Sequence, residues 1–313
     1  MCQDIDKSNN QAKLEEHHLS SDQCSTDPRC HPVAAINRQA SSNAIEVKHR
    51  SSSCGEQTWI ASTRDDLAEC YRLVYKIYLD CGYTDLKPEQ MRVNLWNALP
   101  GTFTLIAKKA DKLAGTLTCV MDSEAGLPAD GFCSEELQKL RESGRRLCEL
   151  SGLAVDRKHA NATTVLRLFR YALTLTTGFM EGTDFIITVH PKHAPFYEDL
   201  LLFEKLKAKQ QYAHVEGAPA VLLRLNLETL RDRYYEKYAG LRGRKDLHHF
   251  YFVEDQDSIL QSIRNGLQER QRQLNEQSLE RFFFSESQVL TNEDAFRTFR
   301  TQWDSWNHSS TGS

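Results

Sequence analysis

A nearly unbroken apolar run, Leu147–Val155, limits what this chain can fold into more than any other feature. Such a run predicts a buried β-strand. Two of its residues, Glu149 and Gly152, are unusual there. A carboxylate in an apolar strand is costly unless it is partnered or reaches a cavity, and a glycine within a strand marks a bulge or the close approach of another backbone or a ligand.

Strand and helix patterns alternate on both sides of this run. Residues 64–80 repeat apolar side chains every three or four positions, which predicts an amphipathic helix. Thr63 is its predicted N-cap, with Asp66 near the capping-box position. The other predicted helices are 134–142 (capped by Ser134), 163–180 and 194–202, with a helical turn within 89–95. The predicted strands are 57–61, 102–108, 114–121, 147–155, 184–189, 204–212 and 218–226.

The order of these elements begins and ends with a hairpin, so it predicts an α/β (α+β) fold that is not a plain doubly wound sheet. Composition divides the 313 residues into three parts. Residues 1–55 are polar and predict a disordered tail. Residues 56–226 carry the alternating elements of the predicted domain. Residues 227–313 are strongly charged and predict a helical extension that packs on the core or covers a pocket.

Charge and cysteine content exclude several classes of protein. The net charge of -4 argues against a nucleic-acid or anionic-membrane protein. No apolar run is long enough to span a bilayer, and the first residues lack a signal-peptide pattern. The nine cysteines form no CxxC pair, which favours reduced thiols in a cytoplasmic protein. Cys24, Cys30 and His31 are too loosely spaced for us to expect a metal site.

Glu149 has two interpretations at this point. In one, the strand opens at Gly152 and exposes Glu149 and backbone groups to a substrate. In the other, Glu149 lies at a strand edge, faces water and pairs with Arg145 or Arg146. The residue pattern alone leaves these alternatives evenly balanced.

Two later segments add candidate site residues. The loop Arg157–Ala162 leads into a helix that begins at Thr163, and free N–H groups at such a helix start form a natural phosphate site. His190-Pro-Lys-His193 leads into a helix that bears Tyr197. Either histidine suits a general base near neutral pH, although isolated histidines are more often structural or surface groups. The alternative for Tyr197 is the usual structural role, a core aromatic residue with its hydroxyl at the rim.

These segments, in this order and spacing, resemble the GNAT acyltransferases. Glu149–Val155 resembles their central splayed strand, Arg157–Thr163 their cofactor-phosphate loop and helix, and Lys192–Phe203 the helix that carries their tyrosine. More narrowly, residues 57–226 resemble the long-chain N-acyl amino acid synthases. The matching segments are 72–75, Gly82-Tyr83, Gly115–Thr118 with Asp122, Leu127-Pro128, Leu140-Arg141, Glu149–Val155, His190–His193 with Phe196-Tyr197, and Gly217–Ala220.

The resemblance implies a GNAT-like, mixed and largely antiparallel sheet flanked by helices. It also implies an enzyme without a tightly bound cofactor that moves a long-chain fatty acyl group from an acyl-carrier-protein thioester to the amine of an amino acid. Ala160 stands where coenzyme-A-dependent members carry the first glycine of the phosphate loop. Its Cβ hinders close backbone approach, which favours the single phosphate of carrier-bound phosphopantetheine over coenzyme A. Gly152 replaces the arginine of acyl-homoserine-lactone synthases, which argues against S-adenosylmethionine as acceptor.

The expected mechanism gives each candidate a role. Glu149 accepts the amine proton, N–H groups near Gly152 and Leu153 hold the carbonyl oxygen, and Tyr197 protonates the departing sulfur, with His193 as the reserve acid or base. The residues expected along the donor are Gly152, Leu153, Ala154, Val155, Arg157 and Thr163. The candidates for the acceptor carboxylate are Arg72, Arg92 and Arg141. The alternatives are a coenzyme-A-dependent N-acetyltransferase and a non-catalytic module that binds an acyl carrier or acyl group.

Overall fold

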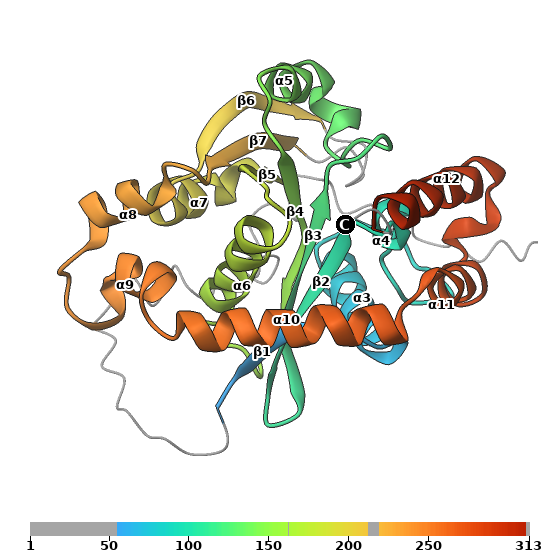
Figure 1. The fold of residues 1–313 in the computed structure, drawn as a ribbon, viewed down its shortest axis with the longest axis horizontal. Helices are drawn as coiled ribbons and strands as arrows, with labels where there is room; N and C mark the ends of the chain where they lie inside the picture. The colour runs from blue at the N-terminus through green and yellow to red at the C-terminus, as the bar shows by residue number, and fades with distance from the viewer. Residues whose placement is uncertain (1–54, 162, 212–218, 311–313) are drawn as a thin grey trace, which may run out of the picture.

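The computed structural model describes residues 55–161, 163–211 and 219–310 (Figure 1). The predicted tail, apart from Gly55, therefore lies outside the described residues, as do Cys24, Cys30, His31, Ala162, Gly217 and Ala218. The strands are β1 Gln57–Ile60, β2 Thr102–Lys109, β3 Lys112–Met121, β4 Leu147–Val155, β5 Asp184–Val189, β6 Glu204–Gln211 and β7 Pro219–Asn226. The helices are α3 Arg64–Asp80, α4 Leu95–Ala98, α5 Asp130–Glu142, α6 Thr164–Gly178, α7 Ala194–Leu201, α8 Leu230–Tyr238, α9 Leu247–Phe252, α10 Gln256–Gln273, α11 Glu276–Arg281 and α12 Glu293–Ser310.

The seven strands form one sheet in the order β1-β2-β3-β4-β5-β7-β6. The β4–β5 pair is parallel, and the other pairs are antiparallel. The predicted mixed and largely antiparallel α/β sheet flanked by helices is therefore confirmed. Side chains of a strand alternate between the two faces of a sheet. Accordingly, Leu105 packs in the cluster that contains α6, whereas Ile106 packs in the cluster that contains α3.

The pairing between β4 and β5 is short. It runs from Leu147 opposite Asp184 to Glu149 opposite Ile186. Beyond this point β4 stays paired with β3, while β5 stays paired with β7 as far as Val189. The two strands thus part directly after Glu149, earlier than the predicted opening at Gly152. Gly152 instead lies at an irregularity between β4 and β3 and has a φ of +59°, a conformation that glycine adopts without strain.

Helix boundaries follow local side-chain contacts. The predicted N-cap of α3 is confirmed, because the Thr63 hydroxyl accepts a hydrogen bond from the Asp66 N–H at 3.1 Å. The predicted helix 134–142 is present as the second segment of α5. A further turn from Asp130 precedes it, and the two segments meet at a kink at Cys133, whose φ of -143° is not helical. The predicted helical turn within 89–95 is wrong. The helix there is α4, which starts after Asn94, where the Asn97 side chain accepts the Asn94 N–H at 2.9 Å.

The helices after Asn226 share the core of the sheet. Figure 1 shows α10 crossing the end of β1, and α10 contacts both β1 and α6. Its Ile263 is fully buried in the same apolar cluster as Ile60. Phe282, which follows α11, and Phe299 of α12 complete a second cluster with Tyr71 of α3. The covered β1 edge is protected from pairing with another chain.

Because α10 lies in the core, we expect that shortening one of its buried side chains lowers the stability of the whole protein. Replacing Ile263 with Ala leaves a cavity in the main cluster, and we expect the free energy of unfolding to fall by about 2–5 kcal/mol in urea denaturation. The neighbouring Arg264 is exposed, so the control Arg264→Ala should change this free energy by no more than about 0.5 kcal/mol. Equal stability of the two variants would show that α10 is not part of the cooperative core.

Candidate functional site

A cavity of about 150 Å³ lies where β4 and β5 part. Its walls come from β4, β5, α3, the segment before α4, and the start and middle of α7. Six of the predicted site residues line it together: Glu149, Gly152, Leu153, His193, Tyr197 and Arg92. The sheet splay therefore brings together side chains that are far apart in the sequence.

Glu149 is buried at the inner end of this cavity, with 3% of its surface exposed. One carboxylate oxygen accepts the Ala129 N–H at 2.8 Å. Burial raises the pKa of Glu149 to about 8; the nearby Asp130 and Asp122 add to the rise, and the Ala129 hydrogen bond opposes it. A carboxyl group with this pKa exchanges a proton near neutral pH.

The alternative in which Glu149 faces water and pairs with an arginine is wrong. Arg145 binds Asp184 at 2.5 Å and also binds Glu228. Arg146 binds Glu181 at 3.1 Å.

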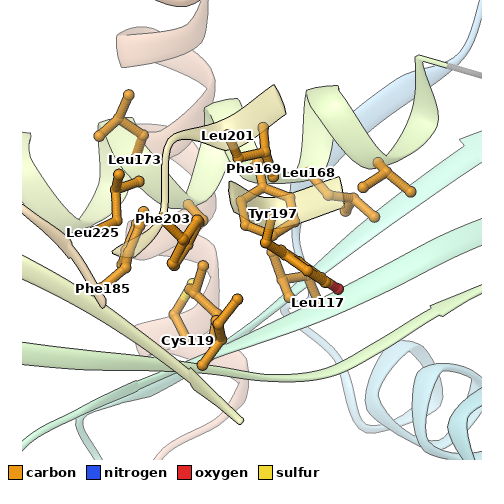
Figure 2. Close-up of a cluster of buried hydrophobic side chains, with 14 of the residues drawn as sticks. Leu117, Cys119, Leu168, Phe169, Leu173, Phe185, Tyr197, Leu201, Phe203 and Leu225 are labelled. Atoms are coloured by element: carbon orange, nitrogen blue, oxygen red, sulfur yellow. The ribbon is translucent and has the colours of Figure 1, made fainter. Parts of the chain in front are cut away.

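Tyr197 reaches the cavity from α7 and is 3% exposed. Its ring packs against Phe169 and Phe203, with centroid distances of 6.1 and 5.9 Å. Figure 2 shows Tyr197 within this apolar cluster, its hydroxyl directed away from Phe203. Burial raises the pKa of Tyr197 well above its usual range. The hydroxyl therefore keeps its proton at neutral pH.

His193 stands at the start of α7 and is also buried. Burial lowers the pKa of His193 to about 3, and Lys192 and His190 lower it further. The imidazole is therefore neutral at pH 7 and a weak base. These values make His193 less suited than Glu149 to accept a proton from a substrate.

The β4 backbone is paired with β5 up to Glu149 and faces the cavity beyond that residue. Because pairing with β5 stops at Glu149, the groups of Leu150–Leu153 on that side face the cavity rather than a described strand. Among the predicted donor residues, Ala154 and Val155 differ from Gly152 and Leu153. They are buried and pair with β3 opposite Thr116 and Gly115.

In the predicted phosphate loop, several backbone N–H groups donate hydrogen bonds to other residues of the same loop. The Asp156 carbonyl accepts from His159 at 3.0 Å and from Ala160 at 2.7 Å, and the Asp156 carboxylate accepts the Lys158 N–H at 2.9 Å. At the start of α6, the Asn161 side chain accepts the Thr163 N–H at 2.8 Å. Of the N–H groups expected to be free at the helix start, that of Thr163 is therefore engaged within the loop.

A carboxylate also occupies the start of α6. Glu56 accepts hydrogen bonds from the Thr164 hydroxyl at 2.7 Å and from the Asn161 side chain at 3.0 Å. Arg157 is exposed on the neighbouring loop. A negative group next to this helix start disfavours a tightly held pyrophosphate at the same place.

The three arginines proposed for the acceptor lie in different places. Arg92 lines the cavity, and its guanidinium lies 4.4 Å from the centre of the Tyr78 ring. Arg72 is exposed on α3 and is not among the cavity residues. Arg141 binds Asp122 and Asp130, each at 2.6 Å, also outside the cavity wall. Of the three, Arg92 is placed to meet a substrate.

Sequence reasoning missed part of the wall. Tyr78, Tyr83 and Asn94 all line the cavity, and the two tyrosine rings lie 6.0 Å apart. Between Tyr83 and Asn94 the sequence pattern predicted a helical turn and the acceptor candidate Arg92, but no site role for Tyr83 or Asn94. The pair Gly82-Tyr83, aromatic and directly after a helix, was the one available signal for a binding surface.

The described ranges contain no group of three or more His, Cys, Asp or Glu side chains arranged to hold a metal ion. The five cysteines in these ranges are buried thiols outside any disulfide: Cys70, Cys81, Cys119, Cys133 and Cys148. None of the helices in the described part combines the length and apolar character needed to cross a membrane.

The raised pKa of Glu149 predicts a pH-dependent stability. Since the pKa is 4.5 in an ordinary environment and about 8 in the folded chain, the folded state favours the protonated form between these values. The free energy of unfolding should fall as pH rises through this window, by about 1.4 kcal/mol for each unit of pKa difference. Glu149→Gln should lack this fall in urea denaturation, and the control Glu181→Gln, at an exposed carboxylate, should retain it. Parallel curves for Glu149→Gln and the unmodified protein would contradict the assignment.

Comparisons with known proteins agree with this geometry. A family profile described as FeeM, an N-acyl amino acid synthase, matches residues 69–226 of the 313. The structure of FeeM from uncultured soil microbes aligns with 57% of this chain and 96% of that chain, at 24% identity and a TM-score of 0.52, which shows a shared fold. No curated protein matches the chain in a sequence comparison.

Two further structures align less closely. The AHL synthase LasI aligns with 55% of this chain and 89% of that chain, at 12% identity and a TM-score of 0.41. A GNAT-family acetyltransferase from Streptococcus pneumoniae aligns with 55% of this chain and 99% of that chain, at 14% identity and a TM-score of 0.40. On the profile match and the shared fold, the chain belongs to the FeeM family of N-acyl amino acid synthases and is an N-acyltransferase.

Proposed function

We propose that this enzyme transfers a long-chain fatty acyl group from an acyl-carrier-protein thioester to the amine of an amino acid. The observation that carries the proposal is the buried Glu149 at the point where β4 and β5 part, with Tyr197 lining the same cavity. One group with a pKa near neutrality and one hydroxyl that keeps its proton are the two partners that aminolysis of a thioester needs.

In the proposed reaction, the neutral acceptor amine attacks the thioester carbonyl carbon through its nitrogen lone pair. As the N–C bond forms, Glu149 takes the proton that the nitrogen loses, directly or through a water molecule. Backbone N–H groups near Gly152 and Leu153 hold the resulting oxyanion, each donor being worth about 3 kcal/mol in comparable sites. The C–S bond breaks, the amide forms, and Tyr197 donates its proton to the departing thiolate. Because the pKa of Glu149 is about 8, the rate should rise as pH approaches this value.

The geometry of the phosphate loop supports a carrier-bound donor. The N–H groups of Lys158, His159 and Ala160 are engaged by Asp156, and Glu56 binds at the start of α6. A coenzyme A pyrophosphate carries more negative charge into this region than the single phosphodiester of a carrier-bound phosphopantetheine. The carrier protein can also supply binding energy through its own surface, so its donor depends less on the loop.

The acceptor carboxylate is proposed to bind Arg92, which lines the cavity beside Tyr78. The cavity of about 150 Å³ is smaller than the roughly 300–1,000 Å³ of pockets for drug-sized ligands. A long acyl chain therefore requires the apolar walls to part when the donor binds.

The remaining expectations are part of the same proposal. Residues 56–226 form the acyltransferase domain, and the helices from residue 227 onward form an extension that supports the sheet. The buried thiols of the described cysteines suit a reducing compartment, so the reaction is proposed to take place in the cytoplasm.

The proposed base can be tested with purified protein. Glu149→Gln should lower turnover by about 10²–10⁴-fold, the usual contribution of a general base, without weakening binding of the acyl carrier protein. Product is measured by mass spectrometry of N-acyl amino acids, with Glu181→Gln as the control. Unchanged turnover of Glu149→Gln would remove Glu149 as the base. In the same assay, acyl-carrier-protein and coenzyme A thioesters of one chain length should differ in kcat/KM in favour of the carrier; the reverse preference would overturn the proposed donor.

The proposed role of Arg92 predicts a separate effect, on the KM for the amino-acid acceptor. Arg92→Gln removes the charge proposed to bind the carboxylate, so KM for the amino acid should rise by about 10–100-fold, the cost of one charge-assisted hydrogen bond. The KM for the donor should stay the same. The exposed Arg72, replaced by Gln, is the matched control. An equal effect of both variants, or a change in donor KM alone, would place the acceptor elsewhere.

A further inference from the structure

Arg141 organises the segment between β3 and α5, which lies next to Glu149. Its guanidinium makes two forked pairs. Nε and Nη2 donate to the two oxygens of Asp122 at 2.6 and 3.0 Å, and Nη1 and Nη2 donate to those of Asp130 at 2.8 and 2.6 Å. Asp122 follows β3 and Asp130 begins α5, so one side chain joins both ends of the segment 122–130.

The far end of this network touches the carboxylate of Glu149. Asp130 accepts the Leu127 N–H at 2.6 Å, and two residues later the Ala129 N–H donates to Glu149 at 2.8 Å. The turn between them is tight, since Gly126 has a φ of +67° and a Cβ there would lie 2.7 Å from the Asp130 carboxylate. The direction of the Ala129 N–H therefore depends on where Arg141 holds Asp130.

The same arrangement balances charge around Glu149. Asp122 and Asp130 each disfavour a negative Glu149, and the three-quarters buried Arg141 guanidinium lies between them. Bidentate arginine–carboxylate pairs are the strong form of this interaction. The other charged or titratable groups that share the cavity with Glu149 are Arg92, Cys81, Tyr78, Tyr83, His190, His193 and Tyr197.

We propose that Arg141 is a positioning residue, which fixes the segment 122–130 so that Ala129 donates to the base and which offsets part of the charge of the two aspartates beside it. Arg141 does not itself reach the cavity. The inference rests on the proposed role of Glu149 as the base. It explains why an arginine first considered for the acceptor carboxylate is fully engaged by two acidic side chains.

Two substitutions should act in opposite directions. Arg141→Gln removes the cation and loosens the Ala129 hydrogen bond, and both changes disfavour the ionised Glu149. The acid limb of the kcat/KM profile should therefore move to higher pH, by about one unit or more. Asp122→Asn removes one neighbouring negative charge while Asp130 keeps its fork to Arg141, so the limb should move to lower pH. A purely structural role of Arg141 would lower activity in both variants without opposite shifts, and that result would overturn the proposal.

A direct titration separates this inference from the proposed function. The Glu149 carboxyl is followed by ¹³C NMR of protein labelled at glutamate side chains, with Glu149→Gln to assign its signal. Arg141→Gln should raise its titration midpoint, and Arg141→Lys, which keeps the charge but not the forks, should raise it less. Arg146→Gln, at an exposed ion pair, should leave it unchanged. An unchanged midpoint in Arg141→Gln would refute the inference even if Glu149 proves to be the base. A raised midpoint with full activity of Glu149→Gln would refute the base but not the coupling.

Discussion

The short parallel pairing of β4 with β5 is the constraint on which the rest of the structure depends. Only three residue pairs, from Leu147–Asp184 to Glu149–Ile186, join the two strands. Each strand is held along the rest of its length by an antiparallel neighbour on its outer side, β3 for β4 and β7 for β5. The sheet therefore stays continuous at one end and opens at the other, and a substrate can approach backbone groups within the sheet itself.

Burial at this opening sets which side chains of the site are protonated near neutral pH. Glu149 and Tyr197 both lose water, and for both the charged form becomes less favourable. The consequences differ because their ordinary pKa values differ. The carboxyl group moves toward neutrality, where it can exchange a proton with an amine, whereas the phenol stays protonated. One physical effect, burial, therefore supports the role of base proposed for Glu149 and keeps the Tyr197 hydroxyl protonated.

Two groups of residues outside the cavity stabilise the strands and the segment that form its walls. Arg141 with its two aspartates orders the segment that donates to Glu149. The helix α10 covers β1 with Ile263 and places Arg270 against the Thr102 carbonyl at 2.8 Å. The first lies beside Glu149, the proposed base, and the second contributes to the packing of the sheet. The residues after Asn226 thus belong to the same apolar core as the part that resembles known synthases.

The sequence by itself determined most elements and the central strand, because apolar periodicity and capping residues are local. The α3 helix with its Thr63 cap and the β4 strand with Glu149 and Gly152 lie where the pattern predicts. Tertiary structure decided which residues meet. Asp130 extends α5 toward its N-terminus because Arg141 and Leu127 bind its carboxylate, and Arg92 rather than Arg72 lines the cavity. Such outcomes depend on strand pairing and on ion pairs between distant residues, and neither leaves a periodic signal in the chain.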